Sequence, residues 1–135
     1  MTEGYSGTPL AQKLGLKRGM RSWFCGMPAS VRAEIDPDAL GIEEYEVACT
    51  GLQAAHLFVT ERAKLERELD ALLALIERNG FIWVSWPKKA AKVETDITED
   101  VIREVALPKG LVDVKVCAVD SVWSGLKLMI RKENR

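Results

Sequence analysis

The sequence is poor in the residues from which metal and thiol sites are built. It has one histidine and three cysteines in 135 residues. His56 has no clustered cysteine or carboxylate partners, which argues against a metal centre and predicts a structural role for this residue. Cys25, Cys49 and Cys117 form no CxxC pair and each lies in an apolar stretch. We therefore expect reduced, unpaired thiols buried within strands.

Long apolar runs and a net charge are also missing. No apolar run approaches the roughly 20 residues that span a bilayer, and the first residues, MTEGYSGTPLAQK, contain no apolar core of an export signal. The formal net charge of −1 gives no overall field that would attract nucleic acid or an anionic membrane. These absences predict a cytoplasmic protein with no membrane or nucleic-acid partner, in which any basic site is local.

Patterns of strands and amphipathic helices alternate along the chain. Residues 61–78 place leucines and Ile76 on one helical stripe that ends at Asn79-Gly80. A second helix follows Asp96 or Thr98, either of which can cap it. The expected strands are 21–26, 44–50, 56–60, 81–86, 111–120 and 125–132. This alternation predicts one domain over residues 1–135, with a mostly parallel α/β sheet and a closing antiparallel hairpin.

The order of elements resembles that of class I S-adenosylmethionine-dependent methyltransferases. The resemblance comes from LGLKRGMRSWFCG, from Asn79-Gly80 before FIWVSW, and from the final LPKGLVDVKV and GLKLMIRK. It implies a Rossmann-like three-layer sandwich of about six strands, with the last strand antiparallel beside the fifth strand of that fold. The chain also resembles an uncharacterised family of small bacterial proteins. That match rests on Lys13-Leu14-Gly15, Gly19, Gly26, Gly80-Phe81-Ile82-Trp83, Pro87-Lys88 and Trp123-Ser124-Gly125.

Three departures from working methyltransferases argue against the cofactor that this resemblance implies. The first strand is followed by a single glycine, Gly26, and then by Pro28, which has no backbone N–H. No acid is found after the expected second strand, where such enzymes bind the ribose hydroxyls. The segment between the first and fourth strands of that fold is too short for its usual elements. We therefore expect no cofactor.

The segment FIWVSWPKK, residues 81–89, is the main candidate for a binding site. Its apolar run is typical of a strand covered on both faces, and Trp86-Pro87-Lys88-Lys89 would lie at the carboxyl end, where α/β sheets bind ligands. An antiparallel last strand would bring Trp123-Ser124-Gly125 to the same edge. The predicted ligand-binding residues at this edge are Trp86, Lys88, Lys89, Trp123, Ser124 and Gly125, with Gly26, Met27 and Thr60 as further lining.

Tryptophan faces and lysine ammonium groups suit a small planar or anionic ligand. The other interpretation is structural, with tryptophans closing the core, Pro87 ending the strand and the lysines solvated. No catalytic set is evident, since neither Ser85 nor Ser124 has a histidine partner suggested by the sequence. The leading hypothesis is a degenerate methyltransferase-like domain that binds such a ligand or a protein partner. The alternatives are a divergent S-adenosylmethionine-dependent methyltransferase and a homodimeric interaction module, so both monomer and homodimer stay open.

Overall fold

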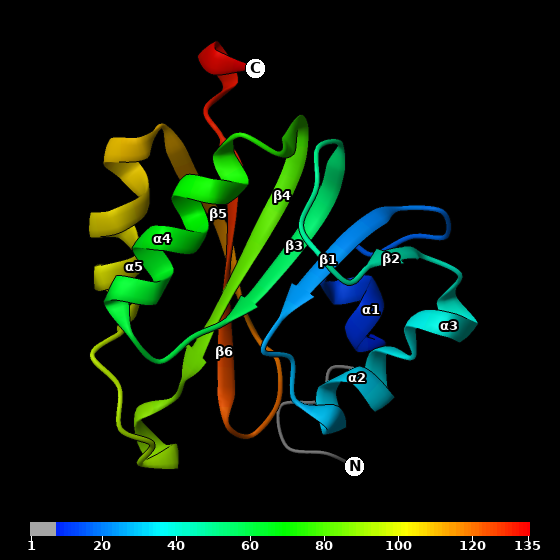
Figure 1. Cartoon of the computed structure of the whole chain (residues 1–135). Helices are drawn as coiled ribbons and strands as arrows, with labels where there is room; N and C mark the ends of the chain where they lie inside the picture. Colours follow the sequence, from blue (N-terminus) through cyan, green and yellow to red (C-terminus); the bar gives the residue numbers. More distant parts are fainter. Residues whose placement is uncertain (1–7) are drawn as a thin grey trace.

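The computed structural model describes residues 8–135, which form a six-stranded sheet between two layers of helices (Figure 1). The strands are β1 (Arg21–Cys25), β2 (Glu43–Tyr45), β3 (Leu52–Phe58), β4 (Ile76–Pro87), β5 (Leu111–Ala118) and β6 (Trp123–Ile130). Their spatial order is β2-β1-β3-β4-β6-β5. The pairs β1–β2, β1–β3 and β3–β4 are parallel, and β6 is antiparallel to both β4 and β5. This is the predicted Rossmann-like α/β sheet, with the antiparallel last strand beside β4.

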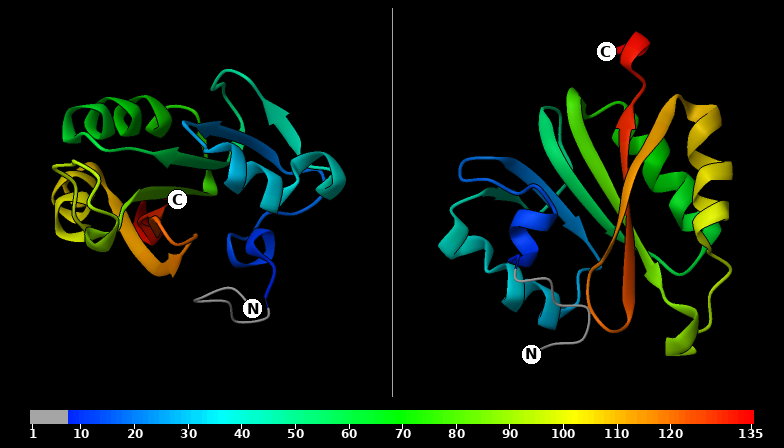
Figure 2. Two further views of the ribbon diagram at one scale, coloured as in Figure 1. Left: turned by 90° about the horizontal axis from the view of Figure 1, so that it is seen from below. Right: turned by 180° about the vertical axis from the view of Figure 1, so that it is seen from behind.

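Within residues 8–135, five α-helices cover the two faces of this sheet (Figure 2). They are α1 (Leu10–Lys13), α2 (Ala29–Ile35), α3 (Pro37–Leu40), α4 (Arg62–Leu73) and α5 (Glu99–Ala106). On one face, leucines of α4 and Ile102 of α5 pack on β3, β4 and β6, and we call this the first core. On the other face, Leu10 of α1 and Val31 of α2 pack around Phe58 and Trp83, which we call the second core. The arrangement gives the three expected layers.

The segment between β1 and β3 contains two short helices and the single strand β2. This segment is therefore too short for all the usual elements of a methyltransferase, as the sequence predicted. β2 is also shorter than the expected strand over 44–50, because it ends at Tyr45. Cys49 consequently lies in an exposed loop, and its predicted burial in a strand was wrong. Cys25 and Cys117 lie in β1 and β5, where both thiols are free and half-buried.

The helix predicted over 61–78 ends early, and its last residues belong to β4. α4 stops at Leu73, and Ile76 pairs with Leu52 of β3. The predicted stop at Gly80 is instead a position inside a strand. A Cβ atom there would lie 2.9 Å from the carbonyl oxygen of Gln53, so the two strands could not approach as closely with another residue. No helix within residues 8–135 combines the length and hydropathy needed to cross a membrane.

Candidate functional site

Two motifs about 35 residues apart meet where β4 ends and β6 begins, as the sequence analysis expected. Trp86 pairs with Ser124, and Pro87 pairs with Trp123. The backbone N–H of Lys88 donates to the carbonyl oxygen of Val122 at 2.7 Å. Because β1, β2, β3 and β4 are parallel, all four end at this same edge of the sheet, the carboxyl edge.

The sequence analysis placed Trp86 and Trp123 in one binding site, but the two tryptophan rings do not share a pocket. Directly paired residues of antiparallel strands project to the same face, and consecutive residues project to opposite faces. Trp86 therefore projects with Ser124 into the first core, whereas Trp123 projects with Pro87 toward the second. Trp123 meets the ring of Phe58 edge-on at 5.2 Å. The sheet separates the two rings.

Lys88 makes a structural contact that the sequence did not show. Its Nζ donates to the carbonyl oxygen of Asp120 at 2.7 Å, within the loop that joins β5 to β6. The carboxylate of Asp120 accepts hydrogen bonds from the backbone N–H groups of Val122 and Trp123. Lys88 thus ties the end of β4 to this loop, while Lys89 is exposed and enters no ion pair with another residue in the 8–135 range.

A cavity of about 460 Å³ opens beside Trp86, between the segment after β4 and the start of α5. Trp86 is 9% exposed there, and Ile97 forms part of the apolar wall. Polar lining comes from Thr95, Thr98 and Glu99. The remaining lining residues are Pro87, Lys88, Lys89 and Val93. Of the candidate ligand-binding residues, the structure brings Trp86, Lys88 and Lys89 to this cavity, and Trp123, Ser124, Gly125, Gly26, Met27 and Thr60 do not line it.

The other candidates lie along the same edge in different surroundings. Gly26 has φ +70°, and a Cβ atom there would lie 3.0 Å from the carbonyl oxygen of Phe58. This glycine therefore allows the loop after β1 to pack against the end of β3. Met27 follows it and packs against the second core. Gly125 is equally enclosed, because an added Cβ would meet the side chain of Trp83 at 3.1 Å.

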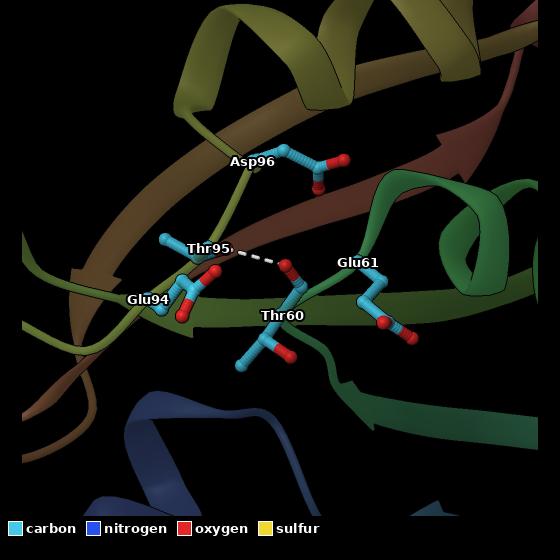
Figure 3. A pocket seen from close by; sticks show the side chains of 5 residues that line it. All are labelled: Thr60, Glu61, Glu94, Thr95 and Asp96. Carbon is cyan, nitrogen blue, oxygen red and sulfur yellow. Dashed lines mark hydrogen bonds between the residues drawn. The ribbon is translucent and has the colours of Figure 1, made fainter.

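Thr60 lines a separate acidic cavity of about 480 Å³ together with Glu61, Glu94, Thr95 and Asp96 (Figure 3). The hydroxyl of Thr95 donates to the carbonyl oxygen of Thr60 at 2.7 Å. Despite the carboxylates, the described part of the chain contains no group of three or more potential metal ligands. One carboxylate also has a structural partner, because Asp96 Oδ1 accepts the backbone N–H of Arg62 at 2.7 Å.

A third cavity, of about 590 Å³, lies at the ends of β1 and β2 and contains a residue that the sequence analysis missed. Glu46 lines it together with Phe24, Arg32, Asp38, Ile42, Glu44 and Tyr45. Because β2 ends at Tyr45, Glu46 is the first residue after the second strand of the sheet. The expected absence of an acid at this position was therefore wrong. The assumed strand 44–50 had placed Glu46 inside the strand.

The charge around this third cavity is mainly negative. Arg32 is its only basic lining residue, and its guanidinium forms a two-pronged ion pair with Glu44, at 2.9 and 2.5 Å. The same guanidinium lies 5.8 Å from the ring centre of Phe24. Asp38 and Glu46 enter no ion pair within residues 8–135. Their carboxylates are thus available to accept hydrogen bonds from hydroxyl groups or to attract a cation.

One serine does have a histidine partner, contrary to the sequence analysis. His56 Nε2 and Ser85 Oγ are hydrogen-bonded at 2.7 Å, and both residues are buried. Burial lowers the pKa of His56 to about 3. The imidazole stacks on Phe58 at 4.3 Å and lies beside Trp83 at 6.3 Å. A pair enclosed in this way has no access to substrate, which agrees with the structural role predicted for His56.

Comparison with solved structures shows what this architecture is similar to. A SAM-dependent methyltransferase from Aquifex aeolicus superposes with a TM-score of 0.62 at 15% identity, covering 96% of this chain and 92% of the other. The fold is methyltransferase-like. Aeropyrum pernix fibrillarin in complex with S-adenosyl-L-methionine gives a TM-score of 0.54 at 11% identity, covering 89% of this chain and 73% of the other.

A tRNA methyltransferase from B. subtilis gives a TM-score of 0.57 at 11% identity, covering 93% of this chain and 65% of that protein. Searches with protein-family models and among curated proteins gave no match. At these identities the likeness establishes the fold alone.

Proposed function

We propose that this chain binds S-adenosylmethionine in the cavity at the ends of β1 and β2, as a divergent member of the methyltransferase fold. The observation that carries the proposal is Glu46, the first residue after β2, whose side chain lines that cavity. In Rossmann-like sheets an acid near this position accepts hydrogen bonds from ribose hydroxyls. The methyltransferase-like strand order supports the same ligand, and so does the similar Aeropyrum pernix fibrillarin, whose structure is a complex with S-adenosyl-L-methionine.

The cavity also suits the other parts of this ligand. Phe24 and Ile42 offer apolar surface to an adenine ring. Asp38 and Glu46 enter no ion pair in the described residues, and the lining has more acidic than basic side chains, which favours a ligand that carries the positive charge of a sulfonium. When bound, S-adenosylmethionine would supply an electrophilic methyl group. The chain's own residues would hold the ribose and balance the charge.

The loop after β1 is less unfavourable for binding S-adenosylmethionine than its sequence indicated. Pro28 is the N-cap residue of α2, so its missing N–H lies outside the first turn of that helix. Gly26 packs against the carbonyl oxygen of Phe58. Because it is the single glycine of this loop, no other glycine is present to allow a close backbone approach to a ligand. The fit therefore rests on the β2 acid and the cavity, and the binding mode differs from that of a glycine-rich loop.

Calorimetric titration with S-adenosylmethionine and S-adenosylhomocysteine tests this proposal. We expect binding by the unmodified protein, and an affinity reduced by about tenfold or more in Glu46→Gln, because a hydrogen bond to a charged group contributes about 1.5–3 kcal/mol. Glu94→Gln makes the same change of charge in the neighbouring acidic cavity and should bind normally. Absence of binding to either compound, or equal affinity in both variants, would contradict the proposal.

The cavity beside Trp86 supports a second candidate, a site for a small planar anion. Its apolar wall, the side chain of Trp86 and the positive charge of Lys89 are the features that favour such a ligand. A thermal-shift screen with aromatic carboxylates should identify compounds that raise the unfolding temperature. The shift should disappear in Lys89→Ala and persist in Lys92→Ala, an exposed lysine outside the lining. A screen without hits would argue for a purely structural role of this segment.

A further inference from the structure

Three lysines from three different elements gather on the hairpin of β5 and β6. Lys115 of β5 and Lys127 of β6 are directly paired across the two strands, so their side chains share one face of the sheet. Lys13 of α1 reaches the same hairpin, where its Nζ donates to the carbonyl oxygen of Ala118 at 3.4 Å. Burial raises the pKa of the Cys117 thiol, and the positive charges of Lys13 and Lys115 oppose this rise. Lys115 and Lys127 therefore lie side by side on the strands farthest from β2, and Lys13 contacts the same hairpin at Ala118.

The three lysines form no ion pair among residues 8–135. Like charges placed directly opposite each other on neighbouring strands are destabilising. The chain thus maintains an unfavourable pair at this position, although the protein as a whole is almost neutral.

Lys127 is the most constrained of the three. It is half-buried, and its Nζ lies 4.6 Å from the ring centre of Phe81. Burial and the neighbouring Lys115 lower the pKa of its ammonium group. The face of the aromatic ring attracts the ammonium group but carries no net charge that could neutralise it. A bound anion would compensate for the burial of the Lys127 ammonium group and for its repulsion by Lys115.

The surroundings of the cluster leave it open to a ligand. In the view from behind, no helix within residues 8–135 lies across the face of β5 and β6 that is turned away from α5 (Figure 2). Lys115 is exposed, and Lys13 and Lys127 are partly so.

We propose that Lys13, Lys115 and Lys127 form a binding site for a phosphate group. A phosphate has several acceptor oxygens and up to two negative charges, and lysine binds phosphates in proteins as a point charge. Ammonium groups from three elements can approach such an anion from different directions. This site is separate from the cavity proposed for S-adenosylmethionine, and neither proposal depends on the other.

Titration with inorganic pyrophosphate, at an ionic strength held constant with sodium chloride, tests the site. Backbone amide shifts in NMR spectra should report saturable binding at β5 and β6. Lys115→Gln and Lys127→Gln should each weaken binding by about tenfold, the expected effect of losing one charge-assisted contact. Lys132→Gln, at an exposed position after β6, is the matched control and should leave binding unchanged.

The substitution Lys115→Glu distinguishes a phosphate-binding site from a like-charge pair that binds nothing. It replaces a like-charge pair with an opposite-charge pair across β5 and β6, so the free protein should unfold at a higher temperature. The same substitution should abolish pyrophosphate binding. Binding that is insensitive to Lys115→Glu and Lys127→Gln, or shifts that sodium chloride alone reproduces, would overturn the proposal.

A short single-stranded RNA in a parallel titration identifies the source of the phosphate. RNA binding that is tighter than pyrophosphate binding and is lost in Lys127→Gln would assign the site to a polynucleotide backbone. Pyrophosphate binding without RNA binding would assign it to a small phosphate compound. Both results support the site, and failure of both ligands to bind overturns it.

Discussion

At the scale of single residues, the buried pair of His56 and Ser85 has the clearest physical consequence. The imidazole is 2% exposed, and its neighbours Phe58 and Trp83 offer no charge that could stabilise an imidazolium. Burial alone therefore holds its pKa at about 3, against an ordinary value of 6.5. The folded protein keeps this histidine neutral, whereas the unfolded chain allows it to take up a proton.

We expect this difference to make the protein less stable in acid. A histidine whose pKa is lowered by folding contributes its full stability above pH 6.5, and this stability is lost as the pH falls from 6.5 toward 3. The loss should approach about 1.4 kcal/mol per pH unit within that window. Urea unfolding at several pH values should show a steeper decline for the unmodified protein than for His56→Gln. Equal slopes would mean that the imidazole is protonated in the folded state as easily as in the unfolded chain.

At the same scale, the two lysines after Pro87 differ in their contacts. The ammonium group of Lys88 donates a hydrogen bond to the carbonyl oxygen of Asp120, whereas the side chain of Lys89 is exposed beside the cavity. Both lysines line that cavity, and Lys88 in addition holds the loop before β6. The sequence did not reveal this contact, because the residue that accepts the hydrogen bond is 32 positions away along the chain.

At the scale of elements, α4 obtains its N-terminal cap from a distant part of the chain. Its own N-cap residue, Glu61, makes no capping hydrogen bond. The backbone N–H of Arg62 donates instead to Asp96, and Arg62 also forms an ion pair with Glu104 of α5. α5 has a local cap, since Thr98 accepts from the backbone N–H of Val101. Asp96 therefore stabilises the preceding helix, and the choice between Asp96 and Thr98 as cap of α5 is resolved in favour of Thr98.

Replacing Asp96 should destabilise the protein although the residue is exposed. Asp96→Ala should lower the free energy of unfolding by about 0.5–2 kcal/mol, because it leaves the Arg62 N–H at the start of α4 without its acceptor. Asp96→Asn keeps an acceptor oxygen and should retain most of that stability. Guanidinium unfolding curves of the two variants measure the difference. Identical midpoints for both would show that the contact contributes nothing.

At the scale of the whole molecule, the two sheet edges explain which oligomeric state to expect. One edge strand, β2, is only three residues long. The other, β5, has a register irregularity between Asp113 and Lys115, and both of these charged side chains are exposed. Short strands, bulges and edge charges all hinder pairing with a second chain.

We therefore expect a monomer rather than the homodimer that the sequence left open. Light scattering coupled to size exclusion should give the mass of one chain, near 15.0 kDa, at concentrations up to the millimolar range. Lys115→Val removes the edge charge beside the exposed Val114 and Val116, and should increase self-association. A dimeric mass for the unmodified protein would contradict this expectation and restore the interaction-module hypothesis.

The sequence by itself determined the features that depend on local patterns. The apolar run of residues 81–86 required a strand covered on both faces, and Phe81 to Pro87 are indeed all buried. Alternation of such strands with amphipathic helices required a mostly parallel sheet, and the short connection between β5 and β6 required a hairpin. These features depend on side-chain periodicity and loop length, which a chain carries within a few neighbouring residues.

Only the tertiary structure decided the features that depend on register and on distant partners. A change of one position in a strand reverses the face to which every side chain projects, so local pattern could not show that Trp86 and Trp123 lie on opposite sides of the sheet. Ile76 fits a helical stripe as well as a strand, and pairing with Leu52 decides in favour of the strand. The end of β2 at Tyr45 makes Glu46 a cavity residue, because strand ends are set by the neighbouring strand as well as by local preference.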